Sequence, residues 1–239
     1  ALENNGRIMI TKPEMTPDQI KAMKLTGTGV VKVVIEGDEM EGPPEWRTFN
    51  NDGTPLNIVS ESLDVEDAGQ EDKTVADDGY AWDSESNTLT LGNVLVEGNI
   101  ILPGGSTVRT DAGAAVLGRI QSSEGSALDI TFTGSALLRI DGGISGGING
   151  ATINVQSGAQ VNVNGSIFLG GSGGQDGTLN VDGAGTTMNI QSGMAYGVMC
   201  DTINIRNGAS LVSRASGSDT RGVMALRGGV HITGGSTRD

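Results

Sequence analysis

The sequence of 239 residues predicts an all-β protein, a right-handed parallel β-helix that follows a small α/β segment. The first observation behind this prediction is a repeated unit: a short alternating strand, a corner at a glycine, and a second alternating strand. The second is composition, because 39 glycines and only 3% aromatic residues suit thin coils with tight corners better than a globular core. The corners recur every 24 to 29 residues, a period typical of a solenoid, at Gly105, Gly134, Gly158, Gly183, Gly208 and Gly235.

Residues 1–78 form the first predicted domain, an N-terminal cap segment with a helix and an acidic loop. Residues 8–10 and 30–35 are rich in β-branched or long apolar residues and predict two strands. Between them, Thr16 and Gln19 form a capping box that predicts the start of a helix. We expect this strand–helix–strand unit to cover the first coil of the β-helix, whose backbone groups would otherwise be unpaired.

The stretch of residues 60–78 is rich in Asp and Glu and poor in apolar residues, which predicts an exposed loop or linker. A calcium loop would place oxygen ligands at alternate positions around a glycine. These acids do not follow that order, so we expect no metal here.

Residues 79–239 form the second predicted domain, the β-helix. It opens with the pair Trp82-Asp83, four further residues, and the run Thr-Leu-Thr-Leu at 88–91. This segment resembles the start of β-helical repeat regions in secreted and cell-surface proteins of gut Firmicutes, which are often labelled carbohydrate-binding domains. The resemblance covers residues 79–92 and implies an extracellular or cell-surface location and a glycan as ligand.

Alternation along each strand predicts which side chains face the core of a coil. Ile153 and Val155 before the corner at Gly158 are inward, and Ile100 and Leu102 are expected to hold the same position before Gly105. Small or apolar segments recur between the repeats and predict a third side, so we expect about six three-sided coils. Right-handed coils follow from the crossover preference of parallel strands. A β-sandwich is the alternative, and it would need a hairpin at each glycine corner.

Asparagines lie between the inward residues of three equivalent strands, at Asn154, Asn180 and Asn204. They are expected to stack in a row on an exposed face. Such a row can serve as structure, with side chains bonded along the coil axis, or as a polar surface for glycan hydroxyls. The aromatic candidates for a stacking platform beside a glycan are Tyr80, Trp82 and Tyr196.

Catalysis has few candidate residues in this sequence. His231, the one histidine, is expected to face outward, and Cys200 to be a small buried residue rather than a nucleophile. The acids of the second domain are scattered, with no pair recurring on one face as a glycosidase requires. We therefore expect a protein that is not an enzyme and uses no cofactor.

The balance of 15 basic and 29 acidic residues gives a formal charge of −14. A phosphate backbone is bound by clustered Lys and Arg, so nucleic acid is not an expected partner, and no apolar run predicts membrane insertion. We expect a bacterial binding or adhesion module for a glycan or a host or cell-wall polymer. The alternatives are a structural stalk or spacer and, third, a polysaccharide-active enzyme. The strand at 230–232 is expected to be an open edge, covered by further sequence or another chain.

Overall fold

The protein forms two compact units, Ala1–Ile58 and Val59–Asp239. The structure is a computed structural model in which the described residues are 2–4, 7–11, 15–26, 30–34, 46–124, 127–146, 150–169, 177–216 and 220–238.

The N-terminal unit is a small sheet with one helix. Strand β1 (Arg7–Ile10) leads through α1 (Pro17–Ala22) into a parallel neighbour, β2 (Val30–Val34), as the sequence predicts. The capping box is confirmed, since the Thr16 hydroxyl accepts a bond from the Gln19 N–H at 3.3 Å and the Thr16 N–H donates to Gln19 Oε1 at 2.9 Å. Two unpredicted antiparallel strands, β3 (Trp46–Asn50) and β4 (Pro55–Val59), extend the sheet.

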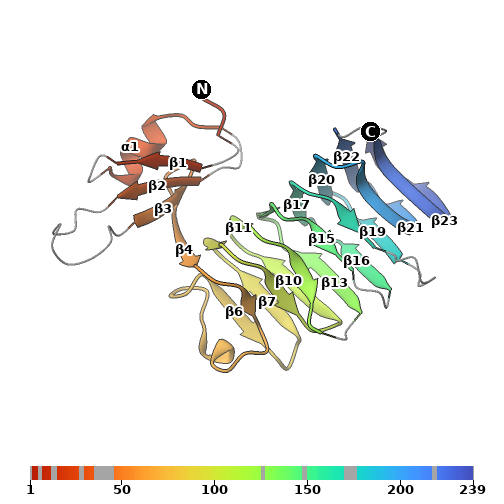
Figure 1. The fold of residues 1–239 in the computed structure, drawn as a ribbon, viewed down its shortest axis with the longest axis horizontal. Coiled ribbons are helices and arrows are strands. Elements are labelled where there is room, and N and C mark those ends of the chain that lie inside the picture. The colour runs from red at the N-terminus through yellow and green to blue at the C-terminus, as the bar shows by residue number, and fades with distance from the viewer. Residues whose placement is uncertain are drawn as a thin grey trace. The chain divides into compact units, whose positions relative to one another are not determined.

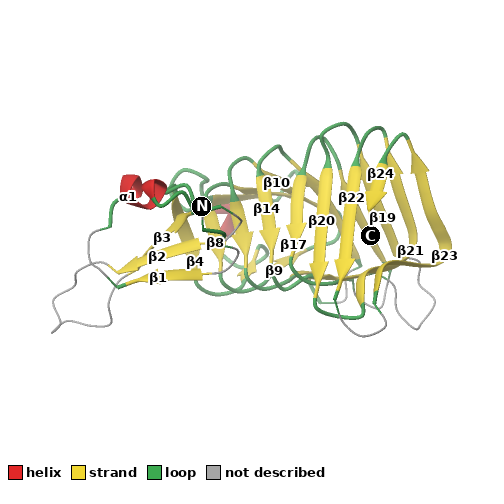
Figure 2. Ribbon diagram, turned by 90° about the horizontal axis from the view of Figure 1, so that it is seen from above, coloured by secondary structure: helices red, strands yellow, loops and turns green. Residues whose placement is uncertain are grey.

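The C-terminal unit is a β-solenoid whose coils have three sides, called A, B and C here (Figure 1). Its strand pairs are parallel and stack coil upon coil, apart from an antiparallel pair at the start, β6 (Tyr80–Asp83) with β7 (Thr88–Leu91). The β-helix is therefore confirmed over the sandwich. Figure 2 shows the stacked strands side by side.

Each side of the solenoid is a stack of strands taken from successive coils. Side A consists of β8 (Val94–Val96), β11 (Ala114–Val116), β14 (Leu137–Ile140), β17 (Gln160–Val163), β20 (Thr187–Ser192), β22 (Ser210–Ala215) and β24 (Ser236–Arg238). Side B consists of β7, β10 (Ser106–Thr110), β13 (Leu128–Thr133), β16 (Ala151–Val155), β19 (Gly177–Asp182), β21 (Tyr196–Arg206) and β23 (Arg221–Thr233). Side C consists of β5 (Leu63–Asp64), β9 (Ile100–Leu102), β12 (Ile120–Ser122), β15 (Ile144–Ser145), β18 (Ile167–Phe168) and the first halves of β21 and β23.

The core consists of ladders of side chains that repeat at one position of every coil. On side B, one ladder runs through paired residues that are at most 1% exposed: Val108, Phe132, Val155, Val181 and Ile205. Each buried aliphatic side chain stabilises the fold by about 1.5–3 kcal/mol. A single coil cannot bury this surface alone, so the stability arises between neighbouring coils.

The spacing between the inward residues and the corner varies by one residue, yet the ladders stay in register. Phe132 and Val155 are partners although the glycine follows two residues after the first and three after the second. The additional residue is Ser157, whose φ of 58° places it in the left-handed region just before Gly158. The turn therefore absorbs the difference, and the strands do not shift.

The expected position of Gly105 in the repeat is wrong. Gly105 precedes β10, whose Val108 pairs with Phe132, whereas Ile100 belongs to side C and pairs with Ile120. Gly105 is thus at the corner between sides C and B. The other five predicted corner glycines, from Gly134 to Gly235, are at the corner between sides B and A. Both corners have a strand–Gly–strand pattern, which is why the sequence does not separate them. Side A holds seven strands, against the six coils expected.

The boundary between the units also differs from the expected one at residue 78. Residues 59–78 belong to the same compact unit as the solenoid. Strand β5 pairs with β9, and Leu63 and Val65 are 1% and 2% exposed in the main core. A two-residue strand followed by the single turn η1 (Gln70–Asp72) has too short a pattern to be recognised in a sequence.

The far end of the solenoid is open within the described residues, as predicted. Among the described strands, β23 pairs only with β21, and its Val230 and Ile232 are 43% and 46% exposed. Their partners on the preceding coil, Ile203 and Ile205, are fully buried. Val230 and Ile232 thus hold the ladder positions of Ile203 and Ile205, and no other described strand covers them.

Candidate functional site

The predicted asparagine row is present on the outer face of side B. Asn154, Asn180 and Asn204 are partners in the ladder of β16, β19 and β21. The Asn180 Nδ2 donates to Asn154 Oδ1 and the Asn204 Nδ2 donates to Asn180 Oδ1, both at 2.8 Å. The row is half-buried, so each amide is held in place and still reaches solvent.

The asparagine row keeps unused hydrogen-bonding capacity. A side-chain amide offers two N–H donors and two acceptor lone pairs. In the row, Asn180 spends one donor and one acceptor on its neighbours. One donor and one acceptor remain at this residue, and both are fixed in direction by the bonds already made.

The asparagine row continues beyond the three residues singled out by sequence. Thr131 lies next to Asn154 in the ladder, and His231 lies next to Asn204 at the exposed end. A second row, of Thr152, Thr178 and Thr202, runs beside it on the same face. Sequence alone missed the threonines, although their constant two-residue offset from the asparagines is a usable signal.

A shallow groove of about 200 Å³ follows the asparagine row on its other flank. The groove brings amide, carboxylate and guanidinium groups together, since Gln156, Asp182 and Arg206 form its second wall. The Asp182 carboxylate accepts a bond from Asn207 Nδ2 at 2.7 Å. The groove therefore offers many polar contacts over several coils and no deep cavity.

Tyr80 and Trp82 lie apart from the asparagine row. They belong to β6, at the first coil, and are only 5% and 7% exposed in the main core. The Tyr80 hydroxyl donates to Gln70 Oε1 at 2.8 Å, and burial raises the pKa of this tyrosine. The two rings are therefore not an open stacking platform beside the asparagines.

Trp82 does line a hollow of about 560 Å³ at the first coil, called the acidic hollow here. Sequence reasoning assigned residues 60–78 to an exposed loop and did not connect them with Trp82. The structure folds this stretch against β6, because the bond from Tyr80 to Gln70 holds η1 in place. The hollow is lined by Val65, Glu66, Asp67, Ala68, Gly69, Glu71, Asp72, Trp82, Ser84, Asn87 and Pro103.

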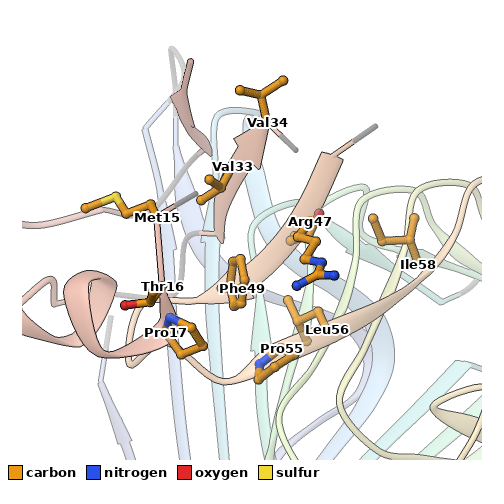
Figure 3. Close-up of a pocket in the computed structure, with 11 residues that line it drawn as sticks. Met15, Thr16, Pro17, Val33, Val34, Arg47, Phe49, Pro55, Leu56 and Ile58 are labelled. Atoms are coloured by element: carbon orange, nitrogen blue, oxygen red, sulfur yellow. The ribbon is translucent and has the colours of Figure 1, made fainter. Parts of the chain in front are cut away.

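The N-terminal unit contains a third hollow, of about 620 Å³ (Figure 3). Its labelled side chains come from the start of α1 and from β2, β3 and β4, and most are apolar, among them Val33, Phe49 and Leu56. Among the described residues of the lining, Arg47 is the one that carries a charge. Such a lining suits an apolar occupant rather than a hydroxyl-rich one.

Cys200 and His231 are not brought together in this structure. The Cys200 thiol is fully buried and donates to the Thr202 carbonyl at 3.4 Å, whereas His231 is exposed and its Nε2 contacts the Gly228 carbonyl at 2.7 Å. Burial, and second the nearby Asp201 charge, raise the pKa of Cys200 to about 12. A thiol of this kind is a poor nucleophile.

We expect the Cys200 thiol to react with a disulfide reagent at pH 8 on the order of a thousandfold more slowly in native protein than in denatured protein. The neutral thiol is the form that the fold favours. Keeping Cys200 protonated therefore contributes fully to the free energy of unfolding below pH 9, and this contribution is lost as the pH rises towards 12. Timed labelling in buffer and in denaturant measures the ratio, and native labelling within tenfold of the denatured rate would contradict a buried thiol.

Among the described residues, no cluster of three or more His, Cys, Asp or Glu could hold a metal ion. In the same part of the chain, no helix has the length and apolar character needed to cross a membrane. Comparison of the chain with known proteins found no relative: no family model, no curated protein and no solved structure matches it.

Proposed function

We propose that this protein is a non-catalytic binding module, secreted or displayed on a bacterial surface, that recognises a glycan along the asparagine row. The observation that carries the proposal is the ladder of fixed amides with unused donors and acceptors. The extracellular location is supported by the resemblance of residues 79–92 to surface repeat regions.

The arrangement of the row favours a linear polymer over a compact ligand. Parallel strands repeat about every 4.8 Å, so identical amides recur along the coil axis at that spacing. A chain of sugars presents hydroxyls at a regular repeat, and successive residues could each meet one coil. The threonine row and the groove with Arg206 add polar groups on both flanks.

A structural stalk is the second candidate, and one observation favours it. The asparagine side chains bond to one another, which stabilises the coil stack without any ligand. The two candidates differ in what loss of a central amide does to binding.

We expect Asn180→Ala to lower the affinity for the bound glycan by about tenfold, because it removes the central amide and frees its two neighbours. The matched control is Asn189→Ala on side A, where Asn189 Nδ2 donates to Asn162 Oδ1 at 3.0 Å in a second asparagine pair. A glycan array followed by calorimetry makes the comparison, with circular dichroism to check folding. No binding by wild-type protein, or equal loss in both variants, would favour the stalk.

A further inference from the structure

The N-terminal unit contains the hollow of about 620 Å³ drawn in Figure 3, called the apolar hollow here. Its volume falls in the range of small-ligand sites, and such sites are mostly apolar with a few polar groups. The asparagine row lies in the other unit, so the apolar hollow is separate from the proposed function. Its apolar walls come from α1, β2, β3 and β4 and include Pro17, Val33, Val34, Phe49, Leu56 and Ile58.

The apolar hollow exists because α1 covers only part of a sheet. The six residues of α1 make a helix about 9 Å long, whereas four strands at about 4.8 Å spacing span about 14 Å. Ile20 of the helix packs in one cluster with Val31 and Phe49. Beyond the start of α1 the hollow is open, and Pro55 and Ile58 on β4 are exposed there. An occupant that covers this apolar surface removes it from water, which favours binding.

Arg47 supplies the hollow with a charge. It is the ladder partner of Val33 and lies two residues before Phe49, so alternation places the three side chains on one face of the sheet. Among the described residues, no ion pair includes Arg47 and its guanidinium makes no hydrogen bond. Figure 3 shows the guanidinium turned toward Leu56, over the hollow. No described residue of the lining is Asp or Glu, so an anion would meet only positive charge there.

From these features we infer that the apolar hollow binds a small amphiphile with an aliphatic body and one carboxylate. The aliphatic body lies against Val33, Leu56 and Ile58, and its burial drives binding. The carboxylate accepts charge-assisted hydrogen bonds from the Arg47 guanidinium, whose paired N–H donors match the two carboxylate oxygens. Because Arg47 is exposed at the rim, the carboxylate remains close to water and is not left in an apolar interior.

Other occupants fit the apolar hollow less well. A cationic amphiphile would bring its charge beside the Arg47 guanidinium, and the two charges repel. A neutral amphiphile leaves the guanidinium without an acceptor. A second copy of the chain needs a larger surface, because a stable interface takes about 20–30 residues from each side and the hollow is lined by 11 residues.

The probe is decanoate, titrated calorimetrically into the full chain at physiological salt and below its micelle concentration. Decyltrimethylammonium has a body of the same length with the opposite charge, and acetate has the charge without the body. We expect decanoate to bind, and both comparison ligands to bind at least about tenfold more weakly.

We expect Arg47→Gln to weaken decanoate binding by about tenfold, because it removes the charge and keeps a polar side chain at the rim. Arg47→Lys, which keeps the charge without the paired donors, restores part of the loss. Ile58→Asp weakens binding as well, since it places a carboxylate in the wall. The matched control is Lys21→Gln, which removes the same charge from an exposed residue of α1 outside the lining. All of these positions are exposed, and circular dichroism checks that the variants fold.

Four results would overturn the inference: no binding of decanoate to wild-type protein, equal binding of decyltrimethylammonium, an equal loss in Arg47→Gln and Lys21→Gln, or self-association of the wild-type chain in sedimentation that Ile58→Asp abolishes. The last result would assign the hollow to a contact between copies. Glycan binding is tested separately through Asn180, so failure of either proposal leaves the other standing.

Discussion

Phe132→Ala should lower the free energy of unfolding by about 3–5 kcal/mol, the range for deleting a large buried aromatic side chain. Phe132 is 1% exposed and lies on side B between Val108 and Val155 of the neighbouring coils. The cost is high because the core of a solenoid is narrow. Few side chains surround the cavity, and each is fixed by its own place in a ladder, so the cavity cannot close by relaxation.

The control for this variant is Phe168→Ala, since Phe168 belongs to side C and is 41% exposed. We expect it to cost less than about 1 kcal/mol, because a side chain that is already half in water loses little on truncation. Urea unfolding followed by circular dichroism compares the two variants. Equal losses would show that burial in the ladder does not set the cost.

Gly142→Ala is expected to destabilise the protein by about 3 kcal/mol through a backbone clash. A Cβ at Gly142 would meet the backbone carbon and oxygen of Gly118 on the preceding coil at 2.5 Å. The two corners approach this closely because the Gly142 N–H donates to the Gly118 carbonyl at 2.8 Å. The neighbour is backbone held in a ladder, so it has no rotamer through which to move away.

The matched control is Gly193→Ala, at the corner between sides A and C of a later coil. A Cβ at Gly193 would have open space within 4 Å, and its φ is not positive. This variant should be neutral or slightly stabilising, because alanine restricts the unfolded chain. Thermal and urea unfolding of both variants provide the measurement. A loss at Gly193 as large as at Gly142 would rule out close coil approach as the cause.

The proposed function depends on observations from the sequence and on observations from the structure. The sequence singled out Asn154, Asn180 and Asn204 because they share a position in repeated strands, and the structure bonds them into a row. The same reasoning grouped Trp82 with a glycan platform, but the structure buries this ring and places it on the first coil, away from the row. Glu71 and Asp72 were assigned to an exposed loop, and both are exposed in the structure, where they also line the hollow that Trp82 lines.

Several features could be predicted from the amino-acid sequence alone: the solenoid, the capping box of α1, the inward ladders, the outward asparagines, and the open edge at Val230 and Ile232. These features are local or periodic, and alternation with a repeat near 25 residues is enough to specify which side chains face one another on stacked strands. Three features became visible in the folded chain and not before: the corner that Gly105 occupies, the place of residues 59–78 in the same unit as the solenoid, and the acidic hollow at Trp82. Corners on different sides of a coil share one sequence pattern, and short strands such as β5 are stabilised by partners distant in the chain rather than by a pattern of their own.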